Sequence, residues 1–109
     1  MQKGLTSRYI IFQILKSLKY ENTNYDSIFA KRVKNIKLNS SDINLIHNVV
    51  LTSMRYNLEI DQIIRIYAKK INKNDNSYFI ILSSIAQIVF LNFKDYAVIH
   101  SSVEIAKTK

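Results

Sequence analysis

The 109-residue sequence contains no cysteine, no proline and no tryptophan, and it has one glycine. The absence of cysteine excludes disulfides, cysteine-ligated zinc, iron–sulfur clusters and thiol catalysis. Glycine and proline usually mark hairpins and tight strand turns, so their scarcity argues against a β-rich fold. The single glycine, Gly4, also excludes glycine-rich phosphate loops and dinucleotide-binding fingerprints. What remains is one domain, residues 1–109, long enough to bury a core without cross-links.

Basic residues outnumber acidic ones by sixteen to eight, which gives a formal net charge of +8. A small body with this charge attracts polyanions at long range, so nucleic acid or an anionic membrane surface leads the candidate partners. A nucleotide bias in the coding genome is an alternative source of the lysines, because isoleucine, asparagine and lysine are all abundant.

The most apolar stretch runs from Tyr78 to Phe93. It is shorter than the roughly 20 residues that a membrane span needs. Four polar residues also interrupt it, namely Ser83, Ser84, Gln87 and Asn92. The stretch therefore predicts the central, buried helix of a small bundle and no membrane partner. No secretory signal precedes the first amphipathic segment, so we expect a cytoplasmic protein.

Apolar residues recur at the helical period in six segments, which predicts an all-α fold. The expected helices run from Thr6 or Ser7 to Tyr20, from Asn24 to about Ile36, from Ser41 to a turn near Asn57, from Ile60 to about Ile71, from Tyr78 to Phe93, and from Asp95 through Ala106. Met54 and Tyr67 are expected to face inward. The short connections favour antiparallel packing of neighbours, in one bundle or in two small bundles side by side.

The sequence shows no pattern of catalytic or metal-binding residues. His47 and His100 lie on separate predicted helices and lack a His-Glu-X-X-His spacing. We interpret one as a surface imidazole and the other as a helix residue with a local hydrogen bond. Asp61, Asp95 and Glu104 are isolated carboxylates without an acid/base partner at i+3 or i+4. The sequence thus predicts a non-enzymatic chain without metal or cofactor.

Two runs, residues 31–37 and 65–73, alternate basic with apolar residues. On a helix such a run points its cations outward and anchors its other face in the core. The cations that we expect to contact phosphates are Arg8, Lys31, Arg32, Lys34, Arg55, Arg65, Lys69 and Lys70. Exposed tyrosines would offer stacking faces to unpaired bases, with Tyr20, Tyr25, Tyr56 and Tyr67 as candidates. The alternatives are a solvated surface for the lysines and a core position for the tyrosines.

Three stretches, taken in order, carry a resemblance to a known family. They are Ser7-Arg8 through Ile11, Ile14 and Leu15; Ser41-Asp42 through Leu45, Val49 and Met54-Arg55 to Ile60-Asp61; and Ala86–Leu91 followed by Asp95–Ile99 and Val103–Lys107. Together they resemble the NusB family, and in particular the NusB-like N-terminal domain of Sun-type ribosomal RNA cytosine-5 methyltransferases. The third stretch is similar to the family's central helix and its Asn-Glu-Ala-Val-Glu-Leu-Ala-Lys signature, although His100-Ser101 stand where Asn-Glu is usual.

The resemblance implies an all-α domain of two three-helix halves that binds RNA without doing chemistry. In the methyltransferases it precedes a catalytic domain that uses S-adenosylmethionine and a cysteine nucleophile, and this chain contains no cysteine. The implied partners are ribosomal RNA and an adjoining methyltransferase domain. For a stand-alone antitermination factor they are RNA and a small ribosomal-subunit protein, and a homodimer stays open. The family continues past the position of Lys109 into a further helix, so we expect a fragment of a longer protein or a member without that helix.

Two interpretations from other classes remain. A helical protein-interaction module would dock a partner helix or an adjoining domain in an apolar groove, with the lysines serving solubility. An even spread of basic residues over the surface would favour it. A peripheral membrane-binding bundle is disfavoured, because no predicted helix combines a wide apolar face with a purely basic one.

Overall fold

The computed structural model describes residues 4–107, and over that range the chain is helical with no strand. The elements are α1 (Leu5–Tyr20), α2 (Tyr25–Val33), α3 (Ser40–Arg55), α4 (Asn57–Tyr67), α5 (Asn76–Ile85), the π-helical segment η1 (Ala86–Phe90) and α6 (Asp95–Lys107). The prediction of an all-α fold with six helices is confirmed. Among the described residues, no helix combines the length and the hydropathy needed to cross a bilayer.

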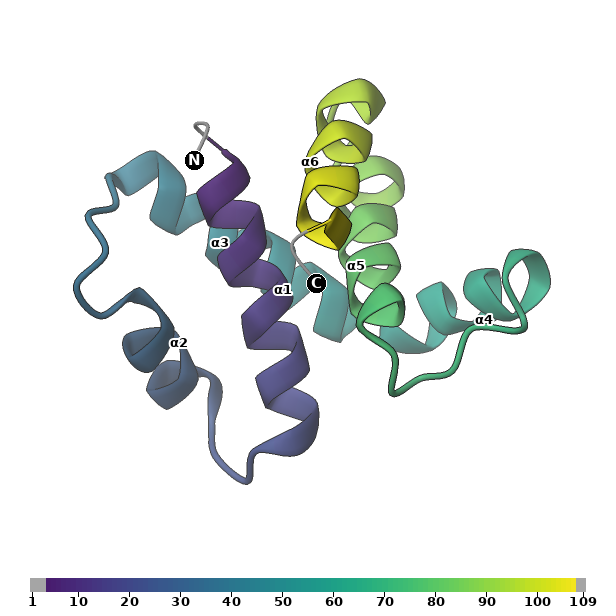
Figure 1. Cartoon of the computed structure of the whole chain (residues 1–109), viewed down its shortest axis with the longest axis horizontal. Helices are drawn as coiled ribbons and strands as arrows, with labels where there is room; N and C mark the ends of the chain where they lie inside the picture. The colour runs from purple at the N-terminus through teal and green to yellow at the C-terminus, as the bar shows by residue number, and fades with distance from the viewer. Residues whose placement is uncertain (1–3, 108–109) are drawn as a thin grey trace.

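The helices form two halves that share a central seam. In the first half α1 packs against α2 and α3, and in the second α5 packs against α4 and α6. Contacts of α1 with α5 and α6 join the halves. Figure 1 shows α2 and α4 at opposite ends of the molecule, with α1 and α5 between them. This arrangement agrees with the expected two three-helix halves.

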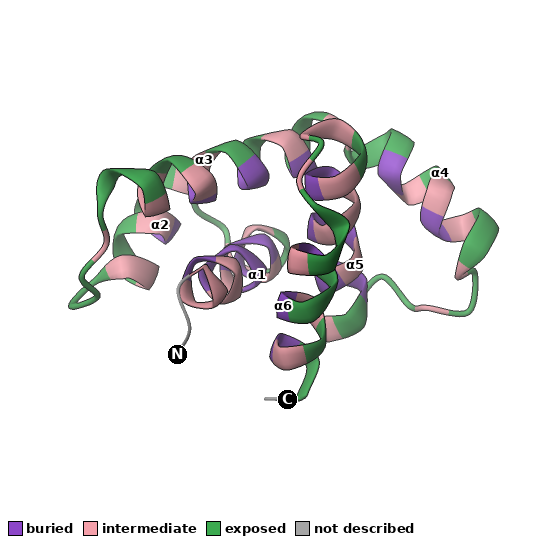
Figure 2. Ribbon diagram, turned by 90° about the horizontal axis from the view of Figure 1, so that it is seen from above, coloured by how far each residue is buried: buried purple, intermediate pink, exposed green. Residues whose placement is uncertain are grey.

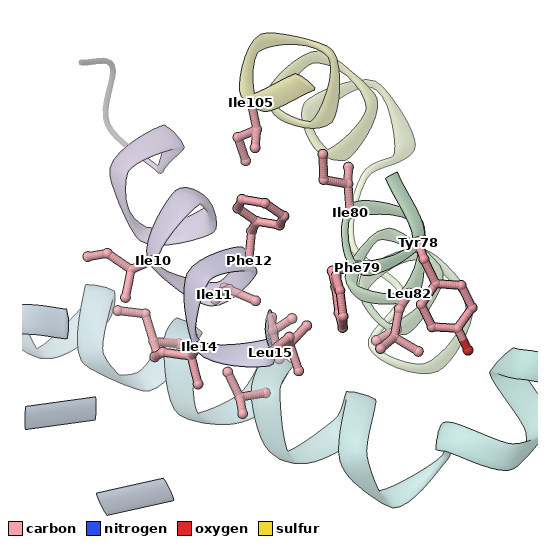
Figure 3. Close-up of a cluster of buried hydrophobic side chains, with 14 of the residues drawn as sticks. Ile10, Ile11, Phe12, Ile14, Leu15, Tyr78, Phe79, Ile80, Leu82 and Ile105 are labelled. Carbon is pink, nitrogen blue, oxygen red and sulfur yellow. The ribbon is translucent and has the colours of Figure 1, made fainter. Parts of the chain in front are cut away.

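The core lies where α1 meets α3, α5 and α6. Five consecutive or near-consecutive side chains of α1 are buried, namely Ile10, Ile11, Phe12, Ile14 and Leu15. Figure 3 shows Phe12 and Leu15 pointing toward apolar side chains of α5 and α6. Figure 2 shows α1 lying between α2, α3 and α6, with buried positions along it. The sequence assigned the central position to the 78–93 segment, and α1 shares it because both helices pack on three or more neighbours.

Local signals set the beginnings of two helices. α1 begins after Gly4, whose φ of 84° suits glycine, rather than at the expected Thr6 or Ser7. α3 begins with a capping box in which the Asn39 side chain accepts from the Asp42 N–H at 2.8 Å and the Asp42 carboxylate accepts from the Asn39 N–H at 3.3 Å. Asp42 thus lies in the first turn of α3, where the helix dipole favours a negative charge.

The second and fourth helices end earlier than their apolar patterns predicted. α2 stops at Val33 rather than near Ile36, and Asn35 then takes a left-handed conformation with φ 64°. α4 stops at Tyr67 rather than near Ile71. A bond from Arg65 Nη1 to the Ile71 carbonyl, 3.1 Å long, holds the turn that follows. This turn brings Ile71 back against the core without a helix.

Two residues that the sequence places in the core are exposed to solvent, namely Tyr67 and Met54. Tyr67 is 84% exposed, because the inner stripe of α4 follows Ile60 and Ile64 to the partly buried Ala68 and leaves Tyr67 beside it. Met54 is 46% exposed, because its neighbour Ser53 occupies the buried face of α3. Both predictions were wrong by one helical position.

Candidate nucleic-acid interface

The expected phosphate contacts do not form one patch. The first basic run belongs to α2 and the segment after it, and the second belongs to α4 and the turn after it. These two helices lie at opposite ends of the molecule in both ribbon views (Figures 1 and 2). Arg8 and Arg55 lie elsewhere, near the beginning of α1 and at the end of α3. The structure therefore divides the eight cations into separate groups.

A cleft of about 230 Å³ lies along one face of α1 and is bordered by Arg32 of α2, in the first basic run. Its lining combines aromatic, cationic and hydrogen-bonding side chains, namely Tyr9, Phe12, Gln13, Lys16, Ser17, Tyr20, Glu21 and Arg32. We call this surface the α1–α2 cleft. Both a stacking face and a positive charge are available in it, which is the pairing that single-stranded nucleic acid requires.

Arg32 is the best-defined cation of the α1–α2 cleft. Its Nη2 donates to Ser17 Oγ at 2.7 Å and lies 3.5 Å from Glu21 Oε2. Its Nε is buried and has no hydrogen-bond partner within the described part of the chain. The Arg32 side chain as a whole is 30% exposed, so the accessible part of its guanidinium can still meet an acceptor such as a phosphate.

Glu21 links the two cations of α2. Its Oε1 lies 3.5 Å from Lys31 Nζ, and its other oxygen faces Arg32. A hydrogen bond from Ser17, helped by the charges of Lys31 and Arg32, lowers the pKa of Glu21. The carboxylate consequently stays ionised at neutral pH and neutralises part of the positive charge at the cleft. Lys34, just past the end of α2, is exposed and makes no ion pair with any described residue.

The four candidate tyrosines differ in availability. Tyr20 is 53% exposed and lines the α1–α2 cleft, and its hydroxyl donates to Asn74 Oδ1 at 3.1 Å. Tyr67 is exposed at the end of α4. Tyr25 and Tyr56 are half-buried and engaged with other side chains. Exposure therefore leaves two of the four as possible stacking faces.

The engaged tyrosines have structural partners. Tyr25 makes a hydroxyl bond of 2.5 Å to His47 Nδ1, and burial raises the pKa of this tyrosine to about 12. Tyr56 stacks on Phe90 with ring centroids 4.3 Å apart and 14° between the planes. This hydrogen bond joins His47 of α3 to Tyr25 of α2, so the expectation of a local bond is wrong. The other histidine, His100, is exposed, as expected for a surface imidazole.

The second basic group surrounds one carboxylate. Asp61 accepts from the Tyr78 hydroxyl at 2.6 Å and lies 3.4 Å from Arg65 Nε and 3.7 Å from Lys73 Nζ. The Tyr78 bond is the largest of several effects that lower the pKa of Asp61. Arg65 is therefore committed to Asp61 and to the turn after α4. Two other cations expected from the sequence, Lys69 and Lys70, are exposed on that turn.

The remaining two cations lie near the seam of the halves. Arg8 Nε donates to Gln87 Oε1 at 2.6 Å, and burial lowers the pKa of this arginine. Gln87 is buried in η1 and donates in turn to the Ser83 carbonyl at 3.0 Å. Arg55 is exposed, with its guanidinium carbon 5.7 Å from the Tyr56 ring centroid. Arg8 thus joins α1 to η1, whereas Arg55 is open to solvent.

Sequence reasoning missed six of the eight residues that line the α1–α2 cleft. Tyr9, Gln13 and Lys16 all line it together with Tyr20. Their signal was present in the sequence, since positions 9, 13, 16 and 20 share one helix face at i, i+4, i+7 and i+11. The prediction of this helix uses its apolar face, which is a different face. Within residues 4–107 no three metal-ligating side chains cluster.

Comparison with known proteins agrees with this fold. A solved chain from the "Crystal Structure of a Plectonemic RNA Supercoil" superposes with a TM-score of 0.86 over 99% of this chain and 82% of that one, at 24% sequence identity. No curated protein matches the sequence. The family description "NusB family" matches residues 5–109, which is nearly the whole length. The chain therefore belongs to the NusB family.

Proposed function

We propose that this chain is a non-catalytic RNA-binding domain that holds RNA at the α1–α2 cleft. Family membership supports RNA binding in general. The observation that carries the location is Arg32, which lines the cleft, is partly exposed and has its Nη2 fixed by Ser17. Lys31 and Lys34 extend the positive surface along α2, and Tyr20 offers an exposed ring beside it. Phosphate contacts would supply the affinity, and ring stacking would favour unpaired bases.

The other expected cations enter the proposal as a second, separate contact. Lys69, Lys70 and Arg55 are exposed, while Arg65 and Arg8 are held by internal bonds. An RNA long enough to span the molecule, whose largest extent is 38 Å, would reach both ends. A short RNA would bind one end only.

We further propose that this domain belongs to a cytosine-5 methyltransferase and recognises the substrate ribosomal RNA of that enzyme. The similarity of the third sequence stretch to those enzymes supports it, as does an exposed apolar face on α6 formed by Tyr96, Ile99 and Val103. Such a face suits an adjoining domain. The alternative is a stand-alone antitermination factor acting with a small ribosomal-subunit protein. A methyltransferase domain encoded in the same reading frame would eliminate that alternative.

The test is a fluorescence-anisotropy titration of a ribosomal RNA hairpin and of a DNA duplex of equal charge. We expect preference for the RNA and a loss of orders of magnitude in affinity between about 50 and 200 mM salt. Reversing Lys31 and Lys34 together (K31E/K34E) should weaken binding by about tenfold and flatten the salt slope. The matched control reverses Lys94 and Lys107, which gives the same net charge on a different surface.

Three results would contradict the proposal. The first is no binding at low salt, which would leave the lysines as a solvated surface. The second is equal loss of affinity in both charge-reversed variants, which would mean that only net charge matters. The third is a loss confined to K69E/K70E, which would move the site to the turn after α4.

A further inference from the structure

A second cavity opens on the other side of α1, between α1, α3 and α5, and has a volume of about 320 Å³. Its floor is apolar and includes Leu15, Leu18, Phe79 and Leu82. Figure 3 shows Leu15 of α1 pointing toward Phe79 and Leu82 of α5. We call this surface, with its rim residues Lys19, Met54 and Lys73, the α1–α5 groove.

Two polar side chains of the lining, Ser53 and Tyr78, are already engaged, whereas Asn57 is exposed. Ser53 Oγ donates to the Val49 carbonyl at 2.7 Å, and the Tyr78 hydroxyl donates to Asp61 at 2.6 Å. A nucleobase or phosphate entering here would lose its hydration without gaining those groups as partners. An apolar side chain has no hydrogen bonds to water to lose on entering, so the floor favours an apolar occupant over RNA.

The rim carries positive charge that is only partly neutralised. Lys19 Nζ lies 3.1 Å from the Lys73 carbonyl and 5.9 Å from the Phe79 ring centroid, and it has no carboxylate partner among the described residues. Lys73 shares the Asp61 carboxylate with Arg65 and Tyr78. Carboxylates of a ligand at this rim would therefore face two ammonium groups beside an apolar floor.

The apolar surface continues outside the cavity. Met54 lines the groove and is largely exposed, and Leu51 lies one turn earlier on the same side of α3. Leu58 is exposed in the first turn of α4. The volume of the cavity is at the lower end of the range of about 300–1,000 Å³ that is usual for small-molecule sites. A chain that inserts one or two side chains and lies along α3 uses this surface better than a compact ligand does.

We propose that the α1–α5 groove docks an acidic peptide segment of a partner protein, which inserts a large apolar side chain into the floor and places Asp or Glu against Lys19 and Lys73. Anchors of this kind dominate the energetics of peptide recognition, and rim charges select the partner. The exposed, flexible Met54 adapts the rim to the shape of the anchor. The groove and the α1–α2 cleft lie on different sides of α1, so the proposal does not depend on RNA binding.

The test pans a random 12-residue peptide library on the immobilised full chain and measures the recovered peptides by fluorescence anisotropy. We expect enriched peptides to combine Phe, Leu, Trp or Met with Asp or Glu. Their affinity should fall by about tenfold or more in K19E and in M54S. Matched controls away from the groove, K107E on α6 and V89S on η1, should change affinity by less than about twofold. All four positions are exposed, and circular dichroism confirms that each variant is folded.

Several outcomes would overturn the proposal. They are the absence of any enriched peptide, enrichment of basic or neutral sequences, and affinity that is equal in the groove variants and their controls. Weaker binding of the ribosomal RNA hairpin to M54S, with displacement of the peptides by that hairpin, would assign the groove to RNA instead. Loss of RNA binding in K31E/K34E with peptide binding retained would leave both proposals standing.

Discussion

The bond between Arg8 and Gln87 allows a quantitative prediction about how the two halves are joined. Its length of 2.6 Å and its charged donor place it among the stronger hydrogen bonds. Such bonds contribute about 1.5–3 kcal/mol in general, and the half exposure of Arg8 reduces this to about 1 kcal/mol. Gln87→Leu also removes the bond to the Ser83 carbonyl, so the single change should cost about 2 kcal/mol.

The second variant is Arg8→Met, which keeps much of the apolar stem and leaves the Gln87 oxygen without this donor. Because Gln87 is only 2% exposed, we expect a cost of about 1–2 kcal/mol. The double variant should then be more stable than the sum of the two single effects predicts, by about 1 kcal/mol. In thermal denaturation this coupling corresponds to roughly 4 °C in Tm.

Urea denaturation followed by circular dichroism at 222 nm measures the free energy of unfolding of four proteins. They are the unchanged chain, the two single variants and the double variant, which together form a double-mutant cycle. Equal m-values for the four would show that the variants differ in stability alone. Additivity of the two single effects to within about 0.3 kcal/mol would refute the argument, because the residues would then act independently. In that case the positioning of η1 would depend on apolar packing and not on Arg8.

Three further predictions concern carboxylates and the core. Tyr78→Phe should destabilise the protein by about 1 kcal/mol at pH 7. Because the pKa of Asp61 is lowered in the folded state, this difference should vanish as pH falls through that pKa, which urea titrations at pH 3–7 would test. Ile46→Ala removes a fully buried side chain and should cost about 2–5 kcal/mol in the same assay, with a cost below 1 kcal/mol contradicting its core position. Glu21→Gln should strengthen binding of the RNA hairpin, because it removes the carboxylate that pairs with Lys31 and Arg32. An equal gain in affinity from Glu104→Gln would contradict a local effect.

The sequence predicted the number, order and approximate extent of the helices well, because each has an apolar stripe at the helical period. It predicted their ends less well. At Ile71 the apolar pattern continued past the helix, since a turn closed by Arg65 also buries an apolar residue. No pattern of period 3.6 distinguishes that turn from another helical turn. The bond that closes it joins a side chain to a backbone carbonyl six residues later.

The candidate site was predictable in its residue types and not in its arrangement. The basic run on α2 was recognised, yet the cleft beside it is completed by residues of α1 that are distant in sequence from that run. The two basic runs look alike in sequence, whereas the fold places them at opposite ends. Gln87 was interpreted as a polar interruption of an apolar run. Its actual partner, Arg8, is 79 positions away, so no local pattern could reveal the bond.

The positions of the carboxylates determine which cations are available to a polyanion. Glu21 faces Lys31 and Arg32, and Asp61 faces Arg65 and Lys73, so one acid serves two cations in each basic group. Hydrogen bonds from Ser17 and Tyr78 lower the pKa of these two carboxyl groups, which extends their ionised form to lower pH. The paired cations are thereby held in fixed orientations. Of the eight cations expected from the sequence, four are exposed and have no carboxylate partner among the described residues, namely Lys34, Arg55, Lys69 and Lys70. Long-range attraction of RNA would therefore depend mainly on the unpaired cations, and the geometry of contact on Arg32.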